Sequence, residues 1–425
     1  MSRFAVHDEY RSSRRWIIVE CALEYFVSIL VSGAYLARIT AGLGFSDGLT
    51  GILTSFASLG CLFQMGSVFL LRNVKSAKRP VILCHLITEL MFVLVYLAPV
   101  VKLSSFQKTA IFLVAYCAAQ VTQNIIRANK TEWTLSLIDD HSRGIFSARN
   151  EMVSLLGGMI FTYIMGSLID RMEAAGNLRG AYIMGAVTLI ILMAAHLFSI
   201  SRIREKPTEN ARDSGAGNTF RQLLGDSGIR RIILIHVLWR IADSAAYPFY
   251  GAYQIRELGF SMTFVSLLSI IYSIVRISVS PLIGRYADRH SFVKMSHMCF
   301  SIAALGYLVN CFTVPSNGRI MYTAYFCLYA IAMGGINSSV NNLIFENVAA
   351  EHRRSALALN AALGGLAGFL STCIMSPIVT AIQNNGNRLF GIHLYAAQFV
   401  SIVAFVMTCV LVVYMKVCIV DRKKH

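Results

Sequence analysis

Long apolar stretches alternate with short polar connections along the whole chain. Each apolar stretch is close to the roughly 20 residues that an α-helix needs to cross a bilayer. We predict twelve membrane-spanning segments, with these bounds: 16–39, 47–71, 80–101, 107–137, 145–169, 179–203, 230–256, 261–284, 292–313, 319–347, 357–383 and 390–417. A polar connection at residues 204–229, which contains Pro, Gly and several charges, divides them into six and six. The pattern predicts an all-α integral membrane protein with one bundle in residues 1–203, a cytoplasmic linker, and a second bundle in residues 230–425.

The composition agrees with this class of protein. Hydrophobic residues make up 56% of the 425 residues and charged residues only 14%, whereas roughly 25% of the residues of soluble domains are charged. The basic start RSSRRW leads straight into the first apolar segment, which is typical of a retained span rather than a cleaved signal peptide. The 10 cysteines are isolated in apolar surroundings, without the spacing of a metal site or a disulfide framework. We therefore expect no metal and no cofactor.

The distribution of basic residues predicts the orientation. With the N-terminus in the cytoplasm, the inner connections hold roughly three times as many Lys and Arg residues as the outer ones, as the positive-inside rule requires. Both termini are therefore expected in the cytoplasm, and the protein is expected in the plasma (inner) membrane, in contact with the lipid bilayer. The same asymmetry accounts for the net charge of +16 without a nucleic-acid partner.

The two halves of the chain show a weak internal repeat. GAYLARITAGLGFS (33–46) matches GAYQIRELGFS (251–261), KRPVILCHL (78–86) matches SFVKMSHMC (291–299), and DDHSRGIFSA (139–148) matches AEHRRSALAL (350–359). The three matches occur in the same order at nearly the same offset. Duplicated six-helix halves are an architecture of secondary transporters, whose solute site lies near the bilayer midplane.

A local motif adds a family resemblance. The stretch GRYADRHSFVK (284–294) lies between the eighth and ninth segments. It resembles the cytoplasmic Gly-x-x-x-Asp-Arg/Lys-x-Gly-Arg-Lys loop of the major facilitator superfamily (MFS), with Gly284, Asp288 and Arg289 as the matching residues and Ser291 and Phe292 as departures. The resemblance implies two pseudo-symmetric six-helix bundles, function as a monomer, and a latch of the outward-open state at Asp288. The corresponding first-half loop, LRNVKSAKRP (71–80), lacks the Gly and the Asp, so that its latching is in doubt.

Ionisable residues inside apolar segments indicate a polar interior, because charged groups facing lipid cost several kcal/mol. In the fourth segment, polar residues recur every three or four positions and therefore share one helical face: Gln120, Asn124, Arg127, Lys130 and Thr134. We interpret this face as the lining of a cavity. The alternative is a helix end that reaches water, where Arg127 and Lys130 extend to the membrane surface.

The seventh segment carries the most regular polar stripe, with steps of three and four residues: His236, Arg240, Asp243, Tyr247, Tyr250 and Gln254. Pro248 lies within the stripe and should kink or weaken the helix. The alternative to a solute site is hydrogen bonding between bundle helices.

Two acidic residues occupy near-equivalent positions of the two halves, Glu24 in the first segment and Asp243 in the seventh. Each is either a proton-coupling site or a static partner for Arg240 or Arg276. Glu89 and His85, one turn apart in the third segment, are expected to form a structural pair.

These patterns together predict a secondary active transporter that works by alternating access. The solute is expected to contact ten side chains: Asn124, Arg127, Trp133, Arg240, Tyr247, Tyr250, Gln254, Arg276, Asn337 and Asn341. The Tyr, Trp, Asn and Gln residues favour a sugar or glycoside taken up with protons, whereas the Arg residues favour an organic anion. A transporter-like membrane sensor is the alternative of another class. No Walker A, HExxH or GxSxG motif occurs, so neither ATP-driven pumping nor enzyme activity is predicted.

Overall fold

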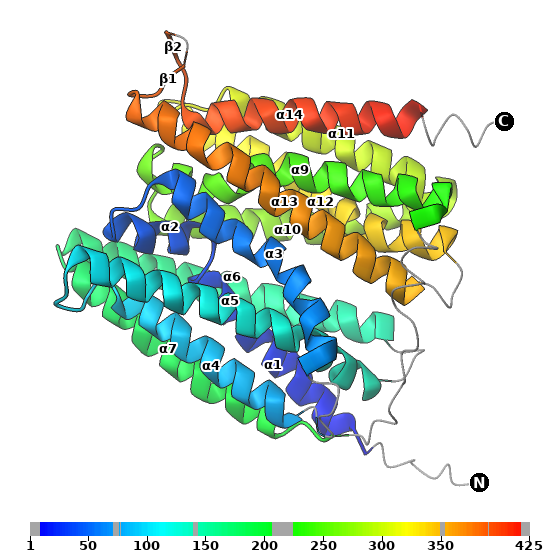
Figure 1. The fold of residues 1–425 in the computed structure, drawn as a ribbon, viewed down its shortest axis with the longest axis horizontal. Helices are drawn as coiled ribbons and strands as arrows, with labels where there is room; N and C mark the ends of the chain where they lie inside the picture. Colours follow the sequence, from blue (N-terminus) through cyan, green and yellow to red (C-terminus); the bar gives the residue numbers. More distant parts are fainter. Residues whose placement is uncertain are drawn as a thin grey trace. The chain divides into compact units, whose positions relative to one another are not determined.

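The computed structural model describes residues 9–70, 76, 78–138, 143–205, 224–348, 353–389 and 391–417, and these are almost entirely helical (Figure 1). The long helices are α1 (Arg11–Leu30), α2 (Gly33–Gly42), α3 (Asp47–Leu70), α4 (Lys78–Leu97), α5 (Ser105–Ser136), α6 (Arg143–Ala174), α7 (Leu178–Ser201), α9 (Ser227–Arg256), α10 (Met262–His290), α11 (Phe292–Cys311), α12 (Gly318–Asn347), α13 (Arg353–Asn384) and α14 (Ala396–Met415). A hairpin of β1 (Arg388–Leu389) and β2 (Ile392–His393) joins the last two helices.

The predicted fold class is confirmed. Among the described residues, eleven helical stretches are long and apolar enough to cross a membrane, with α1 and α2 counted as one. Helix α3 fills the remaining predicted segment. Most of the predicted linker, residues 206–223, and most of the first-half loop at residues 71–80 lie outside the described residues.

The contacts divide the chain into two compact units. Unit 1 comprises Met1–Tyr35 and Phe63–Asn210, and unit 2 comprises Leu36–Leu62 and Ala211–His425. The boundaries predicted at residues 203 and 230 remain predictions. The first predicted segment is not one uninterrupted helix, because α1 ends at Leu30 and α2 begins at Gly33, whose φ is 52°.

In unit 1, α4 packs against α5 and α7, and α1 packs against α6 and α7. At the end of the unit where α1 begins, side chains from α1, α4, α5 and α7 and from the residues just after α5 and α7 form an apolar core: Ile17, Val81, Ile126, Trp133, Leu137, Ile200 and Ile203. This core surrounds the first turns of α1 and fixes the helices that carry the charged residues described below.

In unit 2, α9 packs between α13 and α14, and α12 packs against α10 and α11 (Figure 1). Helix α9 continues through Pro248, and the kink or weakening expected there stays a prediction. Buried tyrosines from α9, α11 and α12 fill the interior: Tyr250, Tyr253, Tyr307, Tyr322, Tyr325 and Tyr329. Each buried tyrosine combines a large apolar ring with a hydroxyl that needs a hydrogen-bond partner. Most of these hydroxyls have such a partner.

The repeated Leu-Gly-Phe-Ser sequence forms the same turn twice in unit 2. Gly44 and Gly259 both have a positive φ, 75° and 63°, a conformation that only glycine adopts without strain. The next serine then caps a helix in each copy, because Ser46 accepts the backbone N–H of Leu49 and Ser261 accepts that of Phe264. The internal repeat read from the sequence therefore has a structural counterpart in these two turns.

A polar network follows these turns and joins three helix ends of unit 2. Arg256 at the end of α9 lies 2.5 Å from the Asp47 carboxylate at the start of α3. The amide of Gln383, on α13, donates to both Asp47 and Glu257, at 2.5 and 2.8 Å. Burial, together with the nearby charge of Asp47, raises the pKa of Glu257 above its ordinary value. The folded protein therefore holds a proton on Glu257 more tightly than the unfolded chain does.

Replacing Glu257 by Gln should remove a pH dependence of stability. Because the folded state holds the Glu257 proton more tightly than the unfolded chain, folding free energy is lost as the pH rises from about 4.5 through the raised pKa. The Glu257→Gln variant should therefore melt a few degrees above the wild type at neutral pH. At pH 4 the variant and the wild type should melt at the same temperature, measured by thermal unfolding in detergent. Glu173→Gln, which removes an exposed carboxyl, serves as the control; an equal gain in both variants would contradict the assignment.

Candidate functional site

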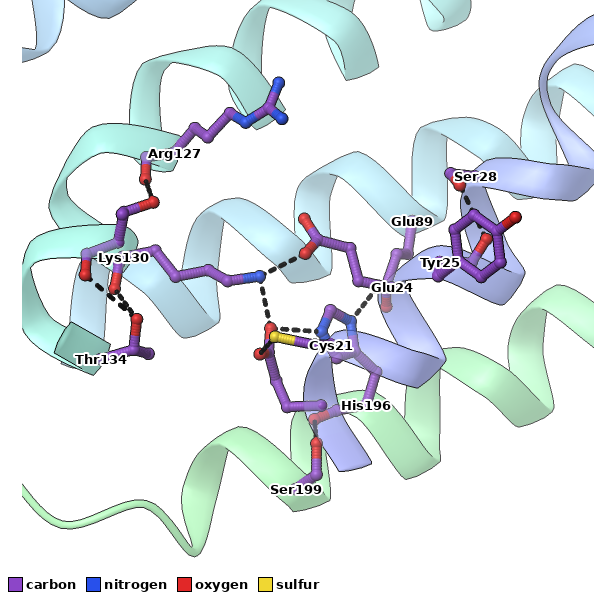
Figure 2. Close-up of polar contacts among 12 residues, drawn as sticks. Cys21, Glu24, Tyr25, Ser28, Glu89, Arg127, Lys130, Thr134, His196 and Ser199 are labelled. Carbon is purple, nitrogen blue, oxygen red and sulfur yellow. Dashed lines mark hydrogen bonds and ion pairs between the residues drawn. The ribbon is translucent and has the colours of Figure 1, made fainter. Parts of the chain in front are cut away.

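Unit 1 contains a lysine that bridges two carboxylates inside the membrane-spanning region. The ammonium group of Lys130, on α5, lies 2.5 Å from Glu20 and 2.5 Å from Glu24. Both carboxylates stand on α1, one helical turn apart, and Figure 2 shows Glu24 pointing toward Lys130. Glu20 and Lys130 are buried, whereas the Glu24 side chain keeps 28% of its surface exposed. Buried charges are tolerated only when they are paired in this way.

A histidine extends this charged cluster to two more helices. His196, on α7, contacts Glu89 through Nδ1 and Glu20 through Nε2, the latter at 3.1 Å. All three side chains are almost completely buried. A neutral imidazole has only one N–H donor, so that two ionised carboxylates at its two nitrogens require a further proton or another cation. Cluster 1 is defined as Glu20, Glu24, Glu89, Lys130 and His196.

Unit 2 contains a partly open cavity of about 400 Å³ next to α9. Its lining residues come from α9, α12 and α13: His236, Trp239, Arg240, Asp243, Met333, Ile336, Asn337, Leu357, Asn360 and Ala361. The lining combines one cation, one carboxylate, two amides and an imidazole with five apolar side chains. Convergent polar groups beside apolar walls are typical of a small-molecule site.

The charged pair on the cavity wall, Arg240 and Asp243, forms hydrogen bonds to other side chains of unit 2. One oxygen of Asp243 accepts hydrogen bonds from the hydroxyls of Tyr307, at 3.0 Å, and Tyr329, at 2.6 Å. Arg240 lies 3.7 Å from the other oxygen of Asp243 and donates to the Ser58 hydroxyl on α3. The carboxylate is thus fixed, while the arginine forms only a long ion pair with it and keeps part of its surface exposed.

The sequence matches a known protein family over most of its length. The model of the Major Facilitator Superfamily matches residues 21–372. The chain belongs to the major facilitator superfamily. No curated protein sequence is similar enough to count as a match.

Solved structures of this superfamily share the fold of the transporter. A mutant of the nucleoside transporter NupG aligns with a TM-score of 0.72 at 14% identity, covering 95% of this chain and 99% of that one. The D-xylose-proton symporter aligns with a TM-score of 0.70 at 14% identity, covering 96% and 97%. A bacterial homologue of the iron transporter ferroportin aligns at 0.69 and 11%, covering 97% and 99%. At such low identity these likenesses establish the fold, and the solute has to be inferred from the side chains.

The predicted face of the fourth segment divides into different environments in the MFS transporter. Lys130 is buried and turns into cluster 1, whereas Arg127 is exposed. Asn124 is buried, and its amide donates to the backbone carbonyl of Gln120. Trp133 lies in the apolar core of unit 1 and donates its indole N–H to the carbonyl of Arg204. The position of Trp133 therefore serves packing rather than a polar cavity.

The stripe of the seventh segment also divides. His236, Arg240 and Asp243 line the cavity of unit 2. Tyr250 is instead buried with its hydroxyl 2.7 Å from that of Ser401, and the Gln254 amide donates to the Tyr322 hydroxyl at 2.7 Å. These two side chains already have hydrogen-bond partners on other helices. This arrangement is the one described by the alternative interpretation of the stripe, hydrogen bonding between bundle helices.

Other predicted contacts are placed as follows. Tyr247 is 45% exposed and its ring stacks on that of Tyr329. Asn337 lines the cavity, whereas the side chain of Asn341 lies outside the described part of the chain. Arg276 stands half-buried on α10 and is not among the lining residues of this cavity.

The predicted latch residues stand on a helix rather than in a loop. Gly284, Asp288 and Arg289 belong to the last two turns of α10, which runs to His290. Helix α11 begins at Phe292, so that Ser291 alone connects the two helices, in extended conformation and with its hydroxyl accepting the N–H of Lys294. The side chain of Asp288 lies outside the described residues, and its latching role remains a prediction.

Sequence reasoning missed several partners. It paired Glu89 with His85, but Glu89 contacts His196 instead. It also omitted Trp239 and Asn360 from the cavity and Tyr307 as a partner of Asp243. A buried carboxylate requires donors, which is a signal that some partner exists, but periodicity within one helix cannot name a residue on another.

Removing the cation of cluster 1 should destabilise the protein strongly. Lys130→Met leaves Glu20 and Glu24 close together without a positive charge, and breaking a buried pair on one side costs about 3–5 kcal/mol. Glu24→Gln should cost much less, because Glu20 still holds Lys130 and the Glu24 side chain is partly exposed. Thermal unfolding in detergent measures both effects. Adding Glu20→Gln to Lys130→Met should recover stability, and Lys102→Met, at an exposed position, is the control; no recovery in the double variant would contradict the pairing.

Proposed function

We propose that the protein is a secondary active transporter that moves a small organic anion, coupled to protons, through the cavity of unit 2. The observation that carries this proposal is the long ion pair on the cavity wall, with 3.7 Å between Arg240 and Asp243. An arginine with a weakly held carboxylate partner is ready to bind a second carboxylate, because its planar guanidinium forms bidentate contacts with such groups.

The remaining lining residues indicate what else the solute carries. Trp239, Met333 and Leu357 offer an apolar surface next to Arg240. Among the described residues, Nδ1 of His236 and Oδ1 of Asn360 are buried without a hydrogen-bond partner. A solute with a hydroxyl or amino group beside its carboxylate would satisfy them, and an unsatisfied buried polar atom costs about 1–3 kcal/mol.

The organic anion is therefore preferred to the sugar. The preference for a sugar rested on Tyr, Trp, Asn and Gln side chains, of which Tyr250, Gln254 and Trp133 already have partners inside the protein. A polyhydroxylated solute would need several unpartnered donors and acceptors in place of these. Arg240 supplies the positive charge and the N–H donors that an anion needs.

Proton coupling follows from the same pair. When a solute carboxylate binds Arg240, Asp243 loses its only nearby cation in the described structure. A carboxylate that loses its cation in a low-dielectric cavity binds a proton more readily. Solute and proton would therefore bind together at neighbouring positions. Glu24 is the weaker candidate for the proton, because Lys130 holds it 2.5 Å away as a static partner.

The wider setting supports this mechanism. The fold is that of the D-xylose-proton symporter and of transporters for other solutes, so that it accommodates proton-coupled transport. Alternating access, function as a monomer, a plasma (inner) membrane location and cytoplasmic termini complete the proposal. A membrane sensor of this fold would bind the solute without moving it.

Two substitutions on α9 separate binding from coupling. Arg240→Gln should weaken solute binding about tenfold or more, since a hydrogen bond to a charged group contributes about 1.5–3 kcal/mol. Asp243→Asn should keep binding and exchange but abolish accumulation driven by a proton gradient. Proteoliposomes with a labelled panel of carboxylates and sugars measure both, with an acidic exterior and with or without a protonophore.

The matched control is Arg230→Gln, which removes an exposed arginine at the start of the same helix. Uptake of a sugar that is unchanged in Arg240→Gln would overturn the organic anion. Binding without any transport in wild-type vesicles would favour the sensor.

A further inference from the structure

Three buried side chains of unit 1 place metal-ligating atoms together. Glu20, His85 and His196 stand on α1, α4 and α7 and are 1%, 2% and 0% exposed. One carboxylate oxygen and one nitrogen from each ring lie within 4.8 Å of one another. The rings of His85 and His196 meet edge to face, with centroids 4.8 Å apart. This convergence is independent of the cavity in unit 2 and of the proposed solute.

His85 provides a second observation that indicates a ligand. Its Nε2 is buried and has no hydrogen-bond partner among the described residues. A buried imidazole nitrogen usually has a partner, because burying it without one costs free energy. An ion bound by Glu20 and His196 would supply that partner.

We propose that Glu20, His85 and His196 form a binding site for a divalent transition-metal ion such as Zn²⁺. Two imidazoles and one carboxylate form a nitrogen and oxygen donor set that suits such ions. Nε2 of His196 and Oε1 of Glu20 are 3.1 Å apart, a separation that allows both atoms to bind one ion. The ion would join α1, α4 and α7. This proposal differs from the sequence analysis, which expects no metal.

The charges of the neighbourhood favour a divalent cation. Glu20, Glu24 and Glu89 contribute three negative charges when ionised, and Lys130 contributes one positive charge. With both histidines neutral, as metal binding requires, two negative charges remain without compensation. A divalent ion neutralises them, whereas an empty site needs protons to do so.

Lys130 competes for Glu20 and is the obvious obstacle. Its ammonium group lies 2.5 Å from Oε1 of Glu20, close to where the ion would bind. Glu24 holds the same ammonium group at 2.5 Å. Lys130 can therefore keep one carboxylate partner on α1 when Glu20 turns to the ion.

Glu89 completes the site as a positioning residue. Its Oε1 contacts Nδ1 of His196, which leaves Nε2 facing Glu20 as the ligating nitrogen. A carboxylate behind a metal-ligating histidine fixes the ring and its tautomer, and loss of such a partner weakens metal binding about 10–100-fold.

Metal binding to the full-length protein in detergent tests the proposal, with an affinity tag that contains no histidine. We expect one equivalent of Co²⁺ to bind with visible ligand-field absorption and to be displaced by Zn²⁺. His85→Asn should abolish the absorption and weaken Zn²⁺ binding, measured by titration calorimetry, at least about tenfold. Because Nε2 of His85 has no hydrogen-bond partner to lose, this variant should fold normally; Glu89→Gln should weaken binding without removing a ligand.

The control is His393→Asn, which removes an exposed imidazole in the β-hairpin. Binding that persists unchanged in His85→Asn, or that disappears in His393→Asn, would assign the metal to the protein surface and overturn the site. The absence of any Co²⁺ spectrum in the folded wild type would overturn it as well. None of these outcomes depends on transport, so that failure of the metal site and failure of the proposed function are distinguishable.

Discussion

The contact of Lys130 with Glu20 and Glu24 is the constraint on which unit 1 depends. A charge inside a membrane-spanning bundle is tolerated only if an opposite charge or a set of hydrogen bonds compensates it. Lys130 satisfies two carboxylates at once, each at 2.5 Å, and thereby ties α5 to α1. Through Glu20 the same charges reach His196 on α7 and Glu89 on α4. These contacts thus tie four helices together by charge, in addition to the apolar core that they share.

Cluster 1 and the cavity of unit 2 differ in their charged pairs, and the difference bears on function. In cluster 1 the ion pairs are short and largely buried, which is typical of contacts that stabilise one arrangement. In unit 2, Arg240 and Asp243 are 3.7 Å apart on the wall of a cavity, and tyrosines rather than the arginine fix the carboxylate. A long pair costs little to separate, so that an incoming anion can take the arginine. The near-equivalent acids Glu24 and Asp243 therefore have different partners, a lysine on another helix in one half and tyrosines in the other.

The sequence was sufficient for the fold because membrane-spanning helices are specified by local properties. Length and hydropathy predicted the segments, and the Leu-Gly-Phe-Ser repeat identified two turns that share glycine conformation and serine capping. The site was only partly predictable, because local properties of one helix do not identify its neighbours. A spacing of three and four places His236, Arg240 and Asp243 on one face, but it also placed Tyr250 and Gln254 there. Whether a polar side chain on that face meets a cavity or another side chain depends on helices far away in the sequence, such as α12 with Tyr322 and α14 with Ser401.

Partner identity is thus the information that one sequence lacks, and it is also what separates structural from functional polar residues. Tyr250, Gln254 and Trp133 have the chemistry of a solute site, yet each already has a hydrogen-bond partner inside the protein. Asn360 does not stand out in the sequence and His85 is expected only to pair with Glu89, yet each has a buried polar atom without a partner in the described structure. In a bundle that must satisfy every buried polar group, the unsatisfied atoms indicate where something outside the chain binds. Such atoms also occur elsewhere in the described residues, but beside Arg240 and between His85 and His196 they coincide with a cavity or with converging ligand atoms.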